Sequence, residues 1–324
     1  MKYLYSIVLS FCLSHGVWAQ SNGGLRFLTI GADPLSLSLS ETNTAVLLGA
    51  PNIFANPANL AYESQSSLSA THSFWIGDTR NIQAAVNLKK NQRALSFGIY
   101  TSLVDDIEAR NTPGSSLGSF SWQYYAFAGS VSQKVGPMSL GITGMYLYEQ
   151  VELSSASGYA FNIGASTELL DKRIRLATVA QSIGKMNLLN ATRSEIPGQF
   201  KIGSEVQAIQ FSVPGETNIP VLVSVAADLV LPVEWIDQEQ FRFDDNPNDF
   251  FKNVSNSWLN LGLRTDISDF LNLRFGYTTD QTSRPFSTGL GIRRYGVEAD
   301  IAFVPFNDGF GSAVSFGLRY AFNQ

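Results

Sequence analysis

Charged residues recur at alternating positions in the last third of the chain. They are Arg264, Asp266, Arg274, Arg293, Glu298, Asp300 and Arg319. Arginine and carboxylate side chains on one face of neighbouring strands can pair with one another, and clustered arginines can also recognise an anionic ligand or partner. We interpret the set mainly as a structural charge ladder, with anion recognition as the functional alternative. Its role depends on the elements that carry it.

Two features resemble catalytic or metal-binding signatures only in part. Residues 114–118 match the Gly-x-Ser-x-Gly pattern, but a nucleophile elbow needs a strand-to-helix turn, and this stretch is typical of a polar loop. His72 is one of two histidines, and a single imidazole cannot assemble a metal site. The sequence therefore predicts a protein that is not an enzyme, with no catalytic residue, cofactor or metal site.

The stretch 237–249 is acidic, and its Asp244-x-Asn246-x-Asn248 run begins like a calcium loop. Asp249 stands where that loop requires glycine, and Ser255 stands where it requires a bidentate glutamate. We interpret the stretch as a solvated external loop that lies near the divalent ions bridging lipopolysaccharide.

The elements that carry these residues read as β-strands. Large apolar side chains alternate with small or polar ones, and successive strand side chains point to opposite faces. The last segment shows this clearly, since Val314, Phe316 and Leu318 alternate with Ser315 and Gly317. We count fourteen segments, at about 66–76, 80–89, 93–104, 120–134, 138–151, 158–170, 173–186, 198–210, 220–231, 257–267, 270–279, 286–294, 297–304 and 313–323. An even number of strands suits a bacterial outer-membrane barrel.

Connection lengths support a membrane barrel over a soluble sandwich. Alternate hairpins are mostly tight, at 90–92, 135–137, 171–172, 268–269 and 295–296, with 211–219 longer. The others are mostly long, at 105–119, 187–197, 232–256 and 305–312, with 77–79 as the exception. Short turns at one end and long loops at the other are typical of transmembrane barrels.

The barrel interpretation also orients the charged residues. No segment after the N-terminus has the roughly 18 uninterrupted apolar residues of a membrane helix. An arginine facing lipid at mid-membrane costs about 2–4 kcal/mol, so the charge ladder must face the lumen. Some strands, such as 126–132 and 222–229, have small or apolar residues on both faces. A plug packed against the inner wall explains them.

The first residues predict export. Met1 to Ala19 read as a secretory signal peptide, with Lys2, an apolar run and small residues before Gln20. Its removal takes away Cys12, the only cysteine, so no disulfide is expected. The formal net charge of −5 provides no basic footprint for nucleic acid.

Residues 20–65 contain a pattern seen before the barrels of one family. Phe27-Leu28, Gly31-Ala32, Thr44-Ala45 and the run Asn56, Pro57, Ala58, Asn59, Leu60 are spaced between the signal peptide and the first strand. This arrangement resembles the N-terminus of the PorV/PorQ family, relatives of the FadL-type outer-membrane transporters. The family usually has an Arg-x-x-x-Met-Gly-Gly-Ala-like run where this chain has residues 35–42, Leu-Ser-Leu-Ser-Leu-Ser-Glu-Thr. From the residues alone, Asn56-Pro57 reads as an Asx-type turn that ends a short helix.

The resemblance implies an organisation and a function. We expect a signal peptide at 1–19, a plug at 20–65 and, at 66–324, an all-β, 14-stranded antiparallel transmembrane barrel in the bacterial outer membrane. The family implies a non-enzymatic role in type IX protein secretion or surface attachment of cargo. Its partners would be outer-membrane lipid, lipopolysaccharide and translocon or attachment-complex proteins, contacted through loops 105–119 and 232–256.

Two alternatives stay open. A FadL-type transporter for hydrophobic small molecules predicts an apolar pocket between plug and wall and a gap in the side of the barrel, whereas the charged ladder argues mildly against an apolar lumen. A purely structural barrel is the third interpretation.

Overall fold

The structure is a computed structural model that describes residues 25–108, 118–190, 192–214, 218–233, 236–237, 242–243, 257–279, 281–307 and 309–323. The expected signal peptide, residues 1–19, lies outside these ranges, as do most of the predicted outer loop 232–256 and most of the Gly-x-Ser-x-Gly stretch.

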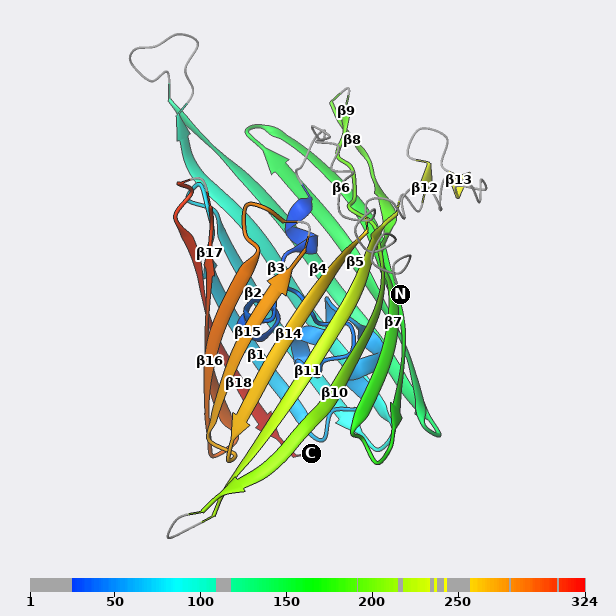
Figure 1. Cartoon of the computed structure of the whole chain (residues 1–324). Helices are drawn as coiled ribbons and strands as arrows, with labels where there is room; N and C mark the ends of the chain where they lie inside the picture. The colour runs from blue at the N-terminus through cyan, green and yellow to red at the C-terminus, as the bar shows by residue number, and fades with distance from the viewer. Residues whose placement is uncertain are drawn as a thin grey trace, which may run out of the picture.

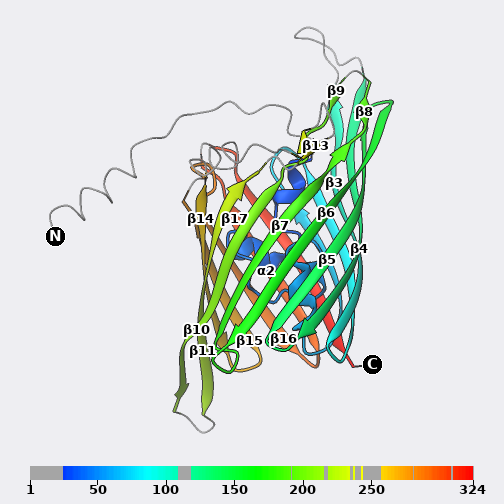
Figure 2. The same ribbon diagram turned by 90° about the vertical axis from the view of Figure 1, so that its right-hand side faces the viewer.

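Within the described ranges, fourteen strands form one closed antiparallel barrel (Figures 1 and 2). They are β1 Ser66–Phe74, β2 Arg80–Lys90, β3 Arg93–Glu108, β4 Ser119–Val135, β5 Met138–Val151, β6 Ser154–Leu169, β7 Ile174–Met186, β10 Gln199–Val213, β11 Ile219–Pro232, β14 Trp258–Ile267, β15 Leu271–Thr278, β16 Phe286–Arg294, β17 Val297–Pro305 and β18 Ser312–Phe322. Each pairs with its neighbour in the chain, and β1 pairs with β18 to close the barrel. The predicted fold class is confirmed.

The two ends of the barrel differ in their connections. The short-turn end carries the turns β2–β3, β4–β5, β14–β15 and β16–β17, and the chain's C-terminus lies there (Figure 1). The opposite, long-loop end carries two small ribbons, β8 Leu188–Leu189 with β9 Thr192–Arg193 and β12 Ile236–Asp237 with β13 Arg242–Phe243. One connection there is shorter than expected: β6 begins at Ser154, so only Glu152 and Leu153 separate it from β5. The small residues Ser154 to Ala156 provide no apolar alternation, which hid this part of the strand.

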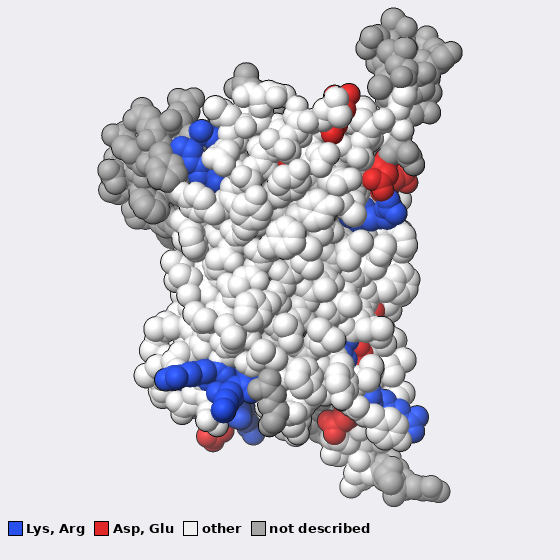
Figure 3. Space-filling view, turned by 180° about the vertical axis from the view of Figure 1, so that it is seen from behind, with Lys and Arg blue, Asp and Glu red and all other residues white. Residues whose placement is uncertain are grey.

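The outer surface of the barrel is apolar in its middle. Leucine, isoleucine, valine and aromatic side chains face outward from the strands, among them Phe97, Phe127, Ile163, Phe275 and Leu318. On the face shown in Figure 3, charged side chains gather toward the two ends and the band between them is almost free of them. Such a belt matches the hydrocarbon layer of a bilayer. Among the described residues, no helix is long and apolar enough to cross a membrane.

Residues 25–65 lie inside the barrel (Figures 1 and 2). This plug contains four short helices: η1 Arg26–Thr29, α2 Pro34–Ser38, η2 Ala50–Ile53 and η3 Pro57–Ala61. The α2 helix begins where the Asp33 carboxylate accepts a hydrogen bond from the Ser36 N–H (3.1 Å) and Pro34 fixes φ in its first turn. Helices this short are not stable alone, so the surrounding wall must hold them.

The wall makes room for the plug with inward-facing glycines. A Cβ atom at these positions would overlap plug atoms: at Gly141 the backbone of Pro57 and Ala58, at Gly164 the side chain of Asn56, and at Gly276 the backbone of Leu39 and Ser40. Gly203, Gly289 and Gly317 lie similarly close to Thr44, Ser38 and Pro34. The strand positions that face the lumen are therefore small because the plug lies in direct contact with the wall there.

Candidate functional site

The lumen has an apolar half, which lies between η1 and the wall formed by β3 to β7. The Phe27 ring lies 5.2 Å from the ring of Tyr100 on β3 and 6.1 Å from that of Tyr124 on β4, centroid to centroid. Phe54 of the plug lies 5.6 Å from Tyr100. Buried small and apolar residues from the same strands complete this aromatic cluster: Ala126, Ala128, Met145, Leu147, Ala156, Ala160 and Met186.

Beside this cluster, the barrel wall is irregular. The register between β6 and β7 shifts so that Asn162 stands opposite Gln181 and Ser182, and Ser182 has a positive φ of 60°. The Ser182 N–H donates to the Asn162 side-chain oxygen (2.8 Å). The pairing of β7 with β10 also ends here, at Gln181 and Gln199. The last residues of β7 therefore lack β10 as a neighbour.

The plug is bound to this bulge through its backbone. The side-chain amides of Asn162 and Gln181 donate to the Phe54 carbonyl oxygen (3.3 and 3.4 Å), and Gln181 also donates to the Ala55 carbonyl oxygen (2.6 Å). The plug backbone at Phe54 and Ala55 is therefore hydrogen-bonded directly to the bulge between β6 and β7.

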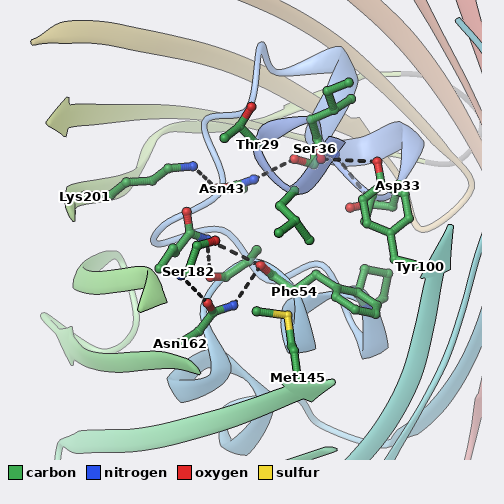
Figure 4. Close-up of a pocket in the computed structure, with 17 residues that line it drawn as sticks. Thr29, Asp33, Ser36, Asn43, Phe54, Tyr100, Met145, Asn162, Ser182 and Lys201 are labelled. Carbon is green, nitrogen blue, oxygen red and sulfur yellow. Dashed lines mark hydrogen bonds between the residues drawn. The ribbon is translucent and has the colours of Figure 1, made fainter. Parts of the chain in front are cut away.

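A small cavity of about 20 Å³ lies between the plug and this wall (Figure 4). Its lining mixes apolar side chains, such as Leu28, Phe54 and Met145, with polar ones, such as Asn43 and Lys201. One water molecule needs roughly 10–15 Å³, whereas a cavity known to hold benzene measures on the order of 150 Å³. The apolar pocket expected for a hydrophobic transporter is therefore present only as a narrow, partly polar space in this conformation.

Two buried charges on the wall face the plug at this level. Lys201 on β10 directs its ammonium group toward the Asn43 Oδ1 atom, 3.4 Å away. The Asp228 carboxylate on β11 accepts three hydrogen bonds through Oδ2, from the N–H groups of Asn43 and Thr44 and from the Thr44 hydroxyl (2.8, 2.9 and 2.8 Å). Because a buried carboxylate is costly unless satisfied, Asp228 clamps the plug backbone in place.

The predicted charge ladder lies on the inner face and is divided into separate ion-paired groups. Arg274 on β15 lies 2.7 Å from Asp300 on β17 and is fully buried. Glu298 accepts from both Arg293 (3.0 Å) and Arg319. Arg264 pairs with Asp266 (2.9 Å). The seven residues thus form three groups, as an ion-paired structural wall requires.

The sequence analysis missed a second set of inner charges. Arg175 on β7 pairs with Glu168 (2.8 Å) and Glu205 (2.7 Å), and its Nη1 also donates to the Ala45 carbonyl oxygen of the plug. Glu205 in turn lies 3.4 Å from Arg264, which joins this set to the predicted ladder. Every second side chain of a strand faces the lumen, and this rule predicts the inner position of the charge ladder. The same rule applied to β7, β10 and β11 predicts inner positions for Arg175, Glu205, Lys201 and Asp228.

At the short-turn end, five residues of the charge ladder line a larger space of about 550 Å³, which we call the vestibule. Arg264, Asp266, Arg293, Glu298 and Arg319 form part of its wall. The plug contributes Leu35, Leu47, Gly49 and Glu63, and the Glu63 carboxylate accepts from the Gly49 N–H (2.7 Å). Burial raises the pKa of Glu63, and the nearby Arg319 opposes that shift. The vestibule is polar and charged, unlike the apolar half of the lumen.

Asn56, Pro57, Ala58 and Leu60, on which the family resemblance rests, lie at the start of η3 and within it. Asn56 begins η3 rather than ending a helix: its Oδ1 accepts from the Ala58 N–H (3.1 Å), and its amide donates to the Thr44 carbonyl oxygen (2.8 Å). All four are buried. Their positions give them a structural role in joining two parts of the plug.

The other sequence candidates are not brought together. His72 lies on the outer face of β1, with its ring 4.6 Å from that of Phe74. The acidic stretch 237–249 lies mostly outside the described residues. In the part of the chain that the structure describes, no three His, Cys, Asp or Glu side chains are placed to hold a metal ion.

No family model and no curated protein matches this sequence. Solved structures do match it. The Ralstonia pickettii toluene transporter TbuX is 10% identical over 90% of this chain and 98% of its own, with a TM-score of 0.56. The Pseudomonas putida toluene transporter TodX is 10% identical over 90% and 99%, also with a TM-score of 0.56. A deltaS2 mutant of TodX, described as a monoaromatic hydrocarbon channel, is 9% identical over 91% and 99%, with a TM-score of 0.55.

These proteins are FadL-like outer-membrane barrels, and at this identity the likeness concerns the fold. This chain has the same architecture, a closed barrel of fourteen antiparallel strands. Together with the apolar belt around the strands, the fold places the protein in the bacterial outer membrane.

Proposed function

We propose that this protein is a FadL-type transporter that admits hydrophobic small molecules from the long-loop end of the barrel. The observation that carries the proposal is the aromatic cluster of Phe27, Phe54, Tyr100 and Tyr124, which lies between plug and wall. Two smaller buried apolar clusters lie elsewhere between plug and wall. The fold shared with proteins described as toluene transporters supports it.

The geometry suggests where such a molecule goes. The narrow cavity at the bulge of β7 lies directly beside the aromatic cluster, and both share Phe54, Tyr100 and Met145. The charged vestibule at the short-turn end opposes passage of an apolar molecule, because its paired charges would lose water on contact with it. In this conformation the cavity is too small for a molecule such as toluene. Binding therefore requires the plug to shift at Phe54 and Ala55.

The experiment measures binding of radiolabelled toluene to the folded barrel in detergent and its uptake by cells that express the protein. Tyr124→Gln places a polar amide in the aromatic cluster and should weaken toluene binding several-fold. Tyr125→Gln is the matched control, since Tyr125 neighbours Tyr124 on β4 but faces outward. Equal effects of the two substitutions, or no binding of toluene, octane or indole by the unsubstituted protein, would contradict the proposal.

The type IX secretion role stays a prediction from the family resemblance. The loops expected to contact partners, 105–119 and 232–256, lie largely outside the described residues, and no described feature favours a secretion partner over a ligand. Affinity purification from cross-linked outer membranes tests it, because a secretion component should recover translocon or attachment proteins.

A further inference from the structure

The β10–β11 hairpin extends past the other turns at the short-turn end (Figures 1 and 2). Its neighbours stop earlier: β7 begins at Ile174, opposite Val206, and β14 ends at Ile267, opposite Val221. One further hydrogen bond continues each side, from the Ser268 N–H to the Pro220 carbonyl oxygen (2.7 Å) and from the Gln207 N–H to Arg173. Beyond these bonds the two strands pair only with each other. The hairpin is therefore a two-stranded ribbon outside the barrel, and all residues of β10 from Gln207 to Val213 are exposed.

This ribbon has a free edge on β10. The Gln207 N–H still donates to the Arg173 carbonyl oxygen (2.9 Å), which continues the line of β7. From there to Val213, the described residues provide no strand on that side, so alternate backbone N–H and C=O groups have no strand partner. We call residues 207–213 the free edge.

The free edge lacks the features that usually protect such edges. Its sequence, Gln-Ala-Ile-Gln-Phe-Ser-Val, contains neither a charged residue nor a proline. Other turns at this end of the barrel are charged, for example Lys90 and Arg93 around β2–β3 and Lys172 and Arg173 before β7. The next charged residue along the chain is Glu216, which follows the free edge.

Its outward face is also apolar. Ile209, Phe211 and Val213 are 57%, 47% and 44% exposed, and Ile219 lies opposite Val213. A bulge between Gln207 and Ile209 keeps these side chains on the outward parity of the strand. Lipid does not explain them, because a strand edge with unpaired backbone groups is not tolerated in hydrocarbon. The ribbon must lie in water, where the described part of the chain provides no partner for its edge or its apolar face.

From this geometry we infer that the free edge is a docking site for an extended segment of a periplasmic protein. Short turns mark the periplasmic end of bacterial barrels. The segment adds to β10 as a third strand and continues the line of β7, so main-chain hydrogen bonds supply the affinity. It is uncharged and has apolar residues at every second position, to match Ile209, Phe211 and Val213. Because Gln210 and Pro220 of the same hairpin line the vestibule, the bound strand lies beside the mouth below the plug.

The first test uses the full-length barrel in lipid nanodiscs and a fluorescent peptide of alternating valine and threonine. The peptide should bind, and a version with every second backbone nitrogen methylated should bind at least ten-fold more weakly, since it lacks the donors that a strand needs. Phe211→Asp should weaken binding by a similar factor. Tyr295→Asp, in the exposed β16–β17 turn at the same end, is the control and should leave binding unchanged. Heat-modifiable migration on gels verifies that each variant is folded.

The second test places a photo-crosslinking amino acid at Ser212 or, as control, at Tyr295, in living cells. A crosslink from position 212 to a different periplasmic chain, lost when Phe211→Asp is also present, is expected. Crosslinks only to a second copy of this protein would overturn the inference in favour of self-association. Absence of protein crosslinks, or equal binding of the methylated and unmethylated peptides, would overturn it altogether.

Discussion

Individual buried polar residues decide how firmly the plug is held. Asp33 shows this: its carboxylate caps α2 but lies almost fully buried near Asp300. Burial raises the pKa of Asp33 to about 6, although the hydrogen bond from Ser36 opposes the shift. The folded protein therefore binds a proton more tightly at Asp33 than the unfolded chain does.

This gives a pH prediction. The contribution of Asp33 to stability is fully present below about pH 4 and is lost as the pH rises toward about 6, because only the folded state then keeps the proton. Asp33→Asn keeps a capping oxygen without a charge, so it should stabilise the protein by roughly 1–3 kcal/mol at pH 7.5 and change little at pH 4. Urea unfolding in lipid vesicles at both pH values measures this. An equal effect at the two values would show that Asp33 carries no buried charge.

At the scale of elements, strands and plug fit together by close backbone approach. Gly164 on β6 and Asn56 at the start of η3 are one such contact, since a Cβ at Gly164 would overlap the Asn56 side chain. Several other strands approach the plug in the same way. These contacts explain how the wall can stabilise plug helices of only four or five residues.

We predict that Gly164→Ala destabilises the barrel by roughly 1–3 kcal/mol, because the plug must move away from the wall. Gly129→Ala is the control, since Gly129 faces outward on β4 and an added Cβ would make only an ordinary contact with the Phe97 ring, 4.0 Å away. Combining Gly164→Ala with Asn56→Ala should cost less than the sum of the single changes, as the overlap is then removed. The unfolding free energies of the unsubstituted protein, the two single variants and the double variant form the cycle, and strict additivity would contradict the proposed contact.

The elements were predictable to different degrees. Alternation and connection length predicted every barrel strand, because lipid outside and a plug inside impose opposite demands on successive side chains. They missed the start of β6 and the length of the β10–β11 hairpin, where residues on both faces are small or exposed. The alternation of side chains predicts that Arg274 and Asp300 face the lumen, but it does not predict that they pair. Their pairing depends on the registers of two successive hairpins, β15–β16 and β16–β17. The plug helices were out of reach, because contacts with strands over 100 residues away stabilise them.

Considered whole, the molecule is a polar-walled barrel closed by its own N-terminal segment. Deleting residues 25–61 should leave a lumen lined by serine, asparagine and paired charges outside the apolar part formed by β3 to β7, and water can fill it. We predict that the deleted form conducts ions in planar bilayers at least ten-fold better than the full chain, with heat-modifiable migration as the folding control. Equal conductance would mean that the plug does not seal the barrel.

The pairing of β1 with β18 also governs how the protein is made. Ser73 on β1 meets Ser315 on β18 across 242 residues of chain, so the cylinder cannot shut before the last strand has been synthesised. Since β1 directly follows the plug, we expect the plug to lie within the curling sheet when the two strands join. A chain cut short before Ser312 would leave β1 as an open edge in the membrane, a form that quality-control proteases can recognise.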